Sequence, residues 1–138
     1  NQIELVGYEM TDLSPAAGDM LELTLYWRAL QKINQDYKIF ANILDPKTLT
    51  KYAASDGMPV NWNAPTTTWK PGEIIKDIHT LKVAPDTPPG IYETEIGWYL
   101  QAEDGSFPRL RIVTPDGGMA DNYLNLSRVR VLAADHQP

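Results

Sequence analysis

The chain has 138 residues, with 18 acidic and 12 basic side chains, a formal net charge of −6 and no cysteine. This length suits one domain of ordinary size, and the absence of cysteine excludes a disulfide scaffold, a thiolate zinc site and a cysteine nucleophile. The acidic balance argues against binding to nucleic acid or to an anionic membrane surface.

Alternation of apolar and polar residues, which places successive side chains on opposite faces of a strand, is the main pattern. In chain order, the predicted strands are Gln2–Tyr8, Met20–Ala29, Tyr37–Leu44, Ile74–Val83, Ile91–Leu100, Leu110–Val113 and Tyr123–Leu132, with short edge pieces near Lys51–Ala53 and Pro59–Trp62. Tyr37–Leu44 is apolar at nearly every position, which is typical of a central strand covered on both faces. The alternation of the last strand slips near Ser127, which predicts a β-bulge or a change of sheet.

The segments between these strands carry turn signals rather than helical periodicity. Asp104-Gly105 lies between two predicted strands and predicts a hairpin. No long stretch has an apolar stripe at helical spacing, and residues 11–17 or 46–52 are expected to form one helical turn at most. The count is therefore seven to nine strands with almost no helix.

This organisation predicts an all-β fold in which two antiparallel sheets pack as a sandwich, immunoglobulin-like or, as the alternative, a jelly roll. Trp27 and Trp98 are expected between the sheets, where each buries a large apolar area. We expect residues 1–132 to form one domain and residues 133–138 a flexible tail. Both ends of the chain are typical of a domain cut from a longer protein.

Two histidines are present, and His136 falls in the predicted tail. His79 shares strand parity with Asp77, so both side chains point to the same face. No Gly-x-Ser-x-Gly or His-Glu-x-x-His motif accompanies them. We therefore interpret the pair as polar residues on a sheet face. Catalysis would require a cleft and a third polar group from another strand.

Acidic residues also form pairs and turns. Glu93 and Glu95 share one face of a strand, which is typical of a solvated sheet face and not by itself of a glycosidase cleft. The acidic turns at Asp104 and Asp116 do not match a calcium loop. The sequence therefore predicts no catalytic residue, no metal site and no cofactor.

Aromatic and amide side chains gather in the segment 51–69. Tyr52, Trp62 and Trp69 lie there with Asn61 and Asn63 in a context rich in proline and threonine. Rings of this kind stack on sugars while amides bind the hydroxyl groups, so these five residues are the candidate ligand-binding set. The alternative is that a tryptophan of this loop plugs the sheet edge, which we favour for Trp69.

Several segments together resemble a known domain type: Ala17–Asp19, Leu23–Ala29, Asp36–Asp45, Thr67–Glu73, Asp77–His79, Pro88–Tyr92 and Ile96–Tyr99. Their order is similar to that in an extracytoplasmic β-sandwich domain of bacterial envelope proteins. That domain is often appended to multi-pass membrane glycosyltransferases that resemble protein mannosyltransferases. The resemblance covers roughly residues 3–132 and carries no catalytic motif within the domain.

The resemblance implies a non-catalytic accessory domain in the extracytoplasmic cell envelope, tethered to the membrane through a parent glycosyltransferase. Its partner would be a glycan, an acceptor or the membrane-embedded part of the parent chain. Two other functions stay open, a free-standing carbohydrate-binding module and a domain that serves protein interaction or spacing. Nucleic-acid binding and direct membrane insertion are not expected.

Overall fold

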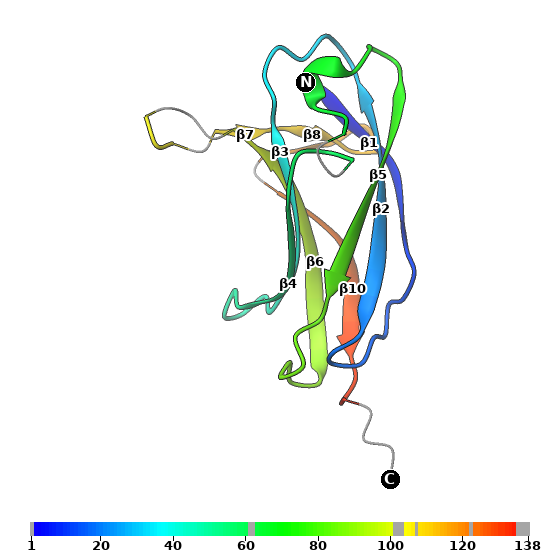
Figure 1. Cartoon of the computed structure of the whole chain (residues 1–138), viewed down its shortest axis with the longest axis vertical. Helices are drawn as coiled ribbons and strands as arrows, with labels where there is room; N and C mark the ends of the chain where they lie inside the picture. The colour runs from blue at the N-terminus through cyan, green and yellow to red at the C-terminus, as the bar shows by residue number, and fades with distance from the viewer. Residues whose placement is uncertain (1, 61–62, 101–103, 107, 122, 135–138) are drawn as a thin grey trace.

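The computed structural model describes residues 2–60, 63–100, 104–106, 108–121 and 123–134. These residues form strands and one short 3₁₀ turn (Figure 1). In chain order the elements are β1 (Ile3–Met10), β2 (Met20–Ala29), β3 (Lys38–Leu44), β4 (Lys51–Gly57), η1 (Thr66–Thr68), β5 (Ile74–Lys82), β6 (Gly90–Tyr99), β7 (Arg109–Leu110), β8 (Ile112–Val113), β9 (Met119–Ala120) and β10 (Leu124–Val131).

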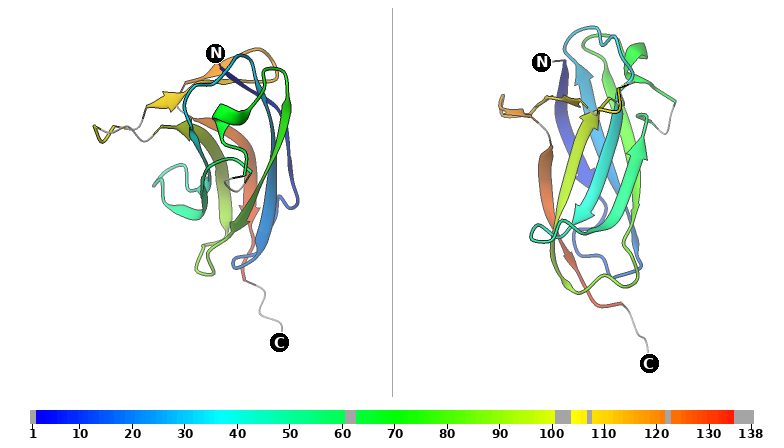
Figure 2. Two further views of the ribbon diagram at one scale, coloured as in Figure 1. Left: turned by 45° about the horizontal axis from the view of Figure 1, so that its top comes forward. Right: turned by 90° about the vertical axis from the view of Figure 1, so that its left-hand side faces the viewer.

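The strands form two sheets that pack face to face (Figures 1 and 2). One sheet has the order β5-β2-β1-β8-β9, and the other has the order β10-β6-β3-β4 with β7 beside β6. All pairings are antiparallel except that of β1 with β8. The predicted two-sheet sandwich is confirmed. Its strand order follows the immunoglobulin-like scheme, with the fourth strand kept in the second sheet.

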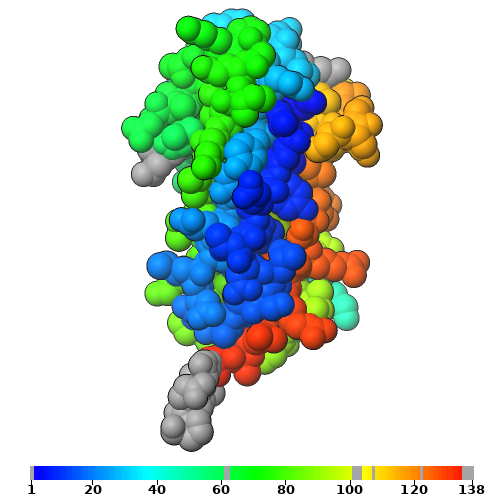
Figure 3. Space-filling view, turned by 90° about the vertical axis from the view of Figure 1, so that its right-hand side faces the viewer, coloured from blue at the N-terminus to red at the C-terminus, as the bar shows by residue number. Residues whose placement is uncertain are grey.

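Backbone hydrogen bonds protect one edge of the second sheet. Residues 13–17 run beside the end of β10, where Arg130 N–H donates to the Leu13 carbonyl and Ala17 N–H donates to the Leu132 carbonyl. In Figure 3 this blue segment lies against the red end of β10, below the side-by-side β1, β2 and β5. The contact covers backbone groups that would otherwise offer a template to another chain.

The core between the sheets contains three tryptophans. Trp27 and Trp98 are fully buried, as predicted, and their rings meet edge to face with centroids 5.0 Å apart. Trp69 joins them from the segment after η1, with its ring centroid 5.7 Å from that of Trp98. Each indole buries a large apolar area, so this cluster contributes on the order of several kcal/mol to stability.

Local details differ from the sequence expectations in three places. The described residues form ten strands, because the short β7, β8 and β9 were not separated by the alternation pattern. The helical turn lies at Thr66–Thr68 and not at 11–17 or 46–52. Pro59 and Val60 lie in a turn, because Val60 takes a φ of 54° that no strand accommodates. The predicted irregularity near Ser127 is confirmed by a register shift between Asn125 and Arg128.

Candidate functional site

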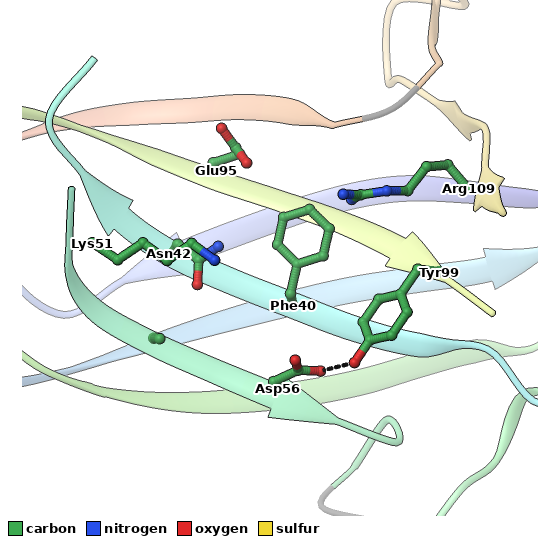
Figure 4. A pocket seen from close by; sticks show the side chains of 8 residues that line it. Phe40, Asn42, Lys51, Asp56, Glu95, Tyr99 and Arg109 are labelled. Carbon is green, nitrogen blue, oxygen red and sulfur yellow. Dashed lines mark hydrogen bonds between the residues drawn. The ribbon is translucent and has the colours of Figure 1, made fainter. Parts of the chain in front are cut away.

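The second sheet carries a hollow on its outer face, which we call the outer hollow (Figure 4). Its volume is about 330 Å³, and its lining residues come from β3, β4, β6 and β7. They are Phe40, Asn42, Lys51, Ala54, Asp56, Glu95, Tyr99 and Arg109.

Strand register explains why the sheet is hollowed here. Asn42 on β3 lies between Ala54 of β4 and Glu95 of β6, and Phe40 lies between Asp56 and Gly97. Alanine and glycine provide almost no side chain above the sheet at these positions. The central strand therefore forms the floor, and the longer side chains of its neighbours form the walls.

One end of the outer hollow is closed by two contacts (Figure 4). The Tyr99 hydroxyl donates a hydrogen bond of 2.6 Å to Oδ1 of Asp56. The Arg109 guanidinium lies over the Phe40 ring, 4.9 Å from its centroid. This cation–π contact places a positive charge at the rim and holds the guanidinium in place.

The same arrangement raises the pKa values of two residues that line the hollow, Glu95 and Tyr99. Burial raises the pKa of the Glu95 carboxyl, and the cations Arg109 and Lys51 partly oppose this change. Burial, followed by the hydrogen bond to Asp56, raises the pKa of Tyr99 to about 12. The Tyr99 phenol therefore keeps its proton at neutral pH and remains a donor to the Asp56 carboxylate.

Asn42 is the unusual residue of the floor. Its side chain is 4% exposed, and the amide points into the hollow from the middle of the sheet (Figure 4). No hydrogen bond joins this amide to any described residue. A buried amide can donate two hydrogen bonds and accept two, so Asn42 offers unused capacity directly to whatever occupies the hollow.

The candidate ligand-binding residues from the sequence do not form this site. Trp69 is 1% exposed, and its Nε1–H donates to the Ala64 carbonyl at 2.8 Å, so the edge-plug interpretation describes it and no ring face is open to a ligand. Tyr52 is half-buried and packs edge to face on Tyr92, with ring centroids 5.3 Å apart. Asn63 is exposed in a turn. Asn61 and Trp62 lie outside the described residues.

The sequence contained only part of the signal for the outer hollow. Alternation places Phe40, Asn42 and Asp56 on one parity of their strands, and Glu95 shares a parity with Tyr99. An asparagine inside a strand that is otherwise apolar was the available clue. The register that sets Asn42 between Ala54 and Glu95 comes from pairing between distant segments, which alternation does not specify.

His79 and Asp77 share one face of β5, as predicted, and that face is the inner one. Asp77 is 0% exposed and His79 is 6% exposed, and both point between the sheets from β5. The reason is that β5 is an edge strand whose inner side faces the inner side of β4. The pair therefore lies in the interior, away from the outer hollow.

Two further properties concern the described residues as a whole. No group of three or more histidine, aspartate or glutamate side chains among them could hold a metal ion. No helix in that part of the chain has the length and apolar character needed to cross a membrane.

Comparison with known proteins yields no family for this chain. No family model and no curated protein matches the sequence. Among solved structures, the chain is similar to the crystal structure of Spo0M, a sporulation control protein from Bacillus subtilis, with 11% identity and a TM-score of 0.44. The match covers 99% of this chain and 51% of that one, so the chain spans about half the length of Spo0M.

Proposed function

We propose that the domain binds a carbohydrate in the outer hollow and performs no reaction there. The observation that carries this proposal is the buried Asn42 amide, which faces the hollow without a hydrogen-bond partner among the described residues. The amide atoms are not among the described buried polar atoms that lack a partner, so they are accessible from the hollow. A ligand hydroxyl that enters the hollow can donate to the amide oxygen and accept from the amide nitrogen.

The charges around the hollow favour a neutral ligand rich in hydroxyl groups. Lys51 and Arg109 contribute positive charge, whereas Asp56 and Glu95 contribute negative charge. A strongly anionic ligand would meet two carboxylates, and a cationic ligand would meet an ammonium and a guanidinium. Hydroxyl groups satisfy donors and acceptors alike, so sugars suit this mixture best.

The size of the hollow supports the same ligand class. A volume of about 330 Å³ is at the lower end of the range for small-ligand sites, which suits a short stretch of glycan. The half-buried ring of Tyr99 forms part of the wall and provides an apolar surface for a sugar ring.

The cellular context of the proposal rests on the sequence resemblance. We assign the domain to the extracytoplasmic cell envelope, as an accessory of a membrane glycosyltransferase that positions a glycan or an acceptor. The coding sequence upstream of Asn1 tests this context directly. Transmembrane helices encoded there would support it, and their absence would contradict it.

A glycan array followed by calorimetric titration tests the binding site. We expect Asn42→Ala to weaken binding about tenfold, which corresponds to the loss of about 1.4 kcal/mol of hydrogen bonding. Asn63→Ala serves as the matched control, since Asn63 is also an asparagine but lies in the exposed turn near the loop candidates. We expect it to leave affinity unchanged within twofold.

The alternative functions give different results in the same experiment. If Asn63→Ala abolishes binding and Asn42→Ala does not, the loop around residues 61–63 is the binding site and the outer hollow is not. If no glycan binds, a spacer or protein-interaction role replaces the proposal. Both variants need a circular dichroism spectrum that matches the unmodified chain.

A further inference from the structure

A chain of three hydrogen-bonding side chains crosses the line where the edge strands β4 and β5 face each other, which we call the seam. The Ser55 hydroxyl of β4 lies 2.9 Å from Nδ1 of His79 on β5. Nε2 of the same imidazole lies 2.7 Å from Oδ2 of Asp77, which is fully buried. The third polar group from another strand, which catalysis would require, is therefore present.

The contacts of the Asp77 carboxylate determine which groups donate and which accept in the hydrogen bonds between Asp77, His79 and Ser55. Oδ1 accepts a hydrogen bond of 2.8 Å from the Val60 backbone N–H, so the carboxylate is held in one orientation. A carboxylate only accepts hydrogen bonds, so Nε2 of His79 carries the ring proton. In the neutral ring Nδ1 is then the acceptor, and the Ser55 hydroxyl donates to it.

The solvent exposure of the three side chains increases from Asp77 through His79 to Ser55. Asp77 is completely buried, His79 is 6% exposed, and Ser55 is half-buried. Ser55 and His79 also line a cavity of about 320 Å³ at the seam, together with Asp56, Gly57, Met58, Ile78 and Thr80. The hydroxyl is thus the member that a small molecule can reach, and the base behind it is oriented by a carboxylate that water does not reach.

We propose that Ser55 is a nucleophile for small carboxylic esters that enter the seam cavity, with His79 as its general base and Asp77 as the positioning residue. Hydroxyl, imidazole and buried carboxylate are the groups that activate serine in acyl transfer, here with the ring nitrogens exchanged, so that Nε2 faces the carboxylate and Nδ1 faces the hydroxyl. The cavity volume restricts the acyl group to a short one. The activity adds to the binding proposed for the outer hollow and does not depend on it.

The reaction follows from the positions of the protons. Ser55 Oγ attacks the ester carbonyl carbon and forms a C–O bond while its proton moves to Nδ1 of His79. The bond between the carbonyl carbon and the alcohol oxygen breaks, and the departing alcohol takes the proton from Nδ1. Water then attacks the acyl-serine, giving a proton to Nδ1, and the acyl group leaves as a carboxylic acid while Ser55 Oγ regains its proton.

A fluorophosphonate probe tests the nucleophile on the whole 138-residue chain. Attack by a serine forms an O–P bond and releases fluoride, and peptide mass mapping locates the adduct. We expect a single adduct on Ser55, which Ser55→Ala removes. His79→Gln should slow labelling about 10²-fold or more, which is the usual contribution of a general base. Hydrolysis of p-nitrophenyl acetate should fall in parallel in both variants.

Ser106→Ala is the matched control. Its hydroxyl donates to the Asp104 carboxylate, and the described part of the chain shows no bond from it to His79, so the Ser106→Ala variant should be labelled and should hydrolyse ester at the unmodified rate. The proposal is overturned if no adduct forms on Ser55, or if Ser55 and Ser106 react equally fast. In that case the hydrogen bonds from Ser55 to His79 and from His79 to Asp77 only hold the two sheets together. Ser55→Ala removes only one oxygen atom, so we expect it to fold. The adduct on Ser55 can therefore be tested even if His79→Gln fails to fold.

A nuclear magnetic resonance signature tests the positioning role of Asp77. We expect the ¹⁵N shifts of His79 to report a proton on Nε2 and an unprotonated, hydrogen-bonded Nδ1. In Asp77→Asn, whose amide can donate to the ring, the preference for this tautomer should be lost and labelling of Ser55 should slow. An unchanged tautomer together with an unchanged labelling rate would remove Asp77 from the proposal.

Discussion

Trp69 and Trp98 are neighbours in the core, but their indole N–H groups differ in what they contact. The Nε1–H of Trp69 donates to the Ala64 carbonyl, whereas Nε1 of Trp98 is buried without a hydrogen-bond partner among the described residues. Replacing either ring by phenylalanine removes a similar volume and keeps an aromatic ring in the cluster. Only the change at Trp69 also breaks a hydrogen bond and leaves a carbonyl unpaired.

We therefore expect Trp69→Phe to lower the free energy of unfolding by about 1–3 kcal/mol more than Trp98→Phe. Urea denaturation of both variants at neutral pH measures this difference. If the free energy of unfolding falls with urea concentration at the same slope in both, their unfolded states are comparable. An equal or larger loss in Trp98→Phe would mean that packing around the central ring outweighs the hydrogen bond.

Single residues also show how far the sequence can be interpreted. Trp27 and Trp98 were predicted in the core because strict alternation identifies the inward face of a strand. Trp69 lies in a loop, where no period identifies its surroundings, so the sequence favoured an edge plug but also kept it in the candidate ligand-binding set. Asn42 and Ser55 were not predicted as functional, because their significance depends on partners that only strand pairing brings close.

At the scale of elements, two glycines differ in whether their backbone conformation requires glycine: Gly7 in β1 and Gly18 in the turn before β2. Gly18 takes a φ of 91° in the turn, a conformation that side chains strain. Gly7 lies at the register shift of β1 without a positive φ, and no atom lies within 4 Å of where its Cβ would be. An added methyl group is thus compatible with the strand and strained in the turn.

We expect Gly7→Ala to raise the free energy of unfolding by about 0.4–1 kcal/mol, because it reduces the entropy of the unfolded chain. Gly18→Ala should lower it by about 1–2 kcal/mol, because the left-handed backbone is strained by a Cβ. Thermal and urea unfolding of the two variants provide matched measurements. Destabilisation by Gly7→Ala would indicate that the bulge of β1 needs glycine for a reason other than space or φ.

Elements with a clear pattern were predicted closely, and elements that depend on pairing were not. The predicted strand Met20–Ala29 has the same bounds as β2. β4 was expected only near Lys51–Ala53, yet it extends to Gly57 because its pairing with β3 continues to Ile39. A strand of small and polar residues has little alternation of its own, so its length is set by its neighbour.

At the scale of the whole molecule, β4 connects the two proposed sites. Its outward residues Ala54 and Asp56 line the outer hollow, and its inward residue Ser55 reaches His79 across the seam. The sandwich could be predicted because alternation specifies two-faced strands. Which sheet edges face each other is decided by how the chain crosses between the sheets, and no local pattern contains that information.

The pH dependence of stability offers a test of the molecule as a whole. Three phenols have raised pKa values in the fold: Tyr26 through its hydrogen bond to Glu9, Tyr92 through burial, and Tyr99, at about 12, through burial and Asp56. In the unfolded chain each titrates near pH 10. Between about pH 10 and 12 the unfolded state therefore binds fewer protons than the folded state, so the free energy of unfolding falls as pH rises.

Tyr99→Phe isolates the largest of these contributions. Below about pH 10 the phenols are protonated in both states, so their contribution to stability does not change with pH there. Between pH 10 and 12 we expect the variant to lose less stability than the unmodified chain, as measured by urea unfolding at matched ionic strength. Lysines also titrate in this range, but they are the same in both proteins, so their contribution largely cancels in the difference between the two slopes. If stability falls with pH at the same slope in both proteins, neither burial nor the contact with Asp56 raises the pKa of Tyr99 in solution.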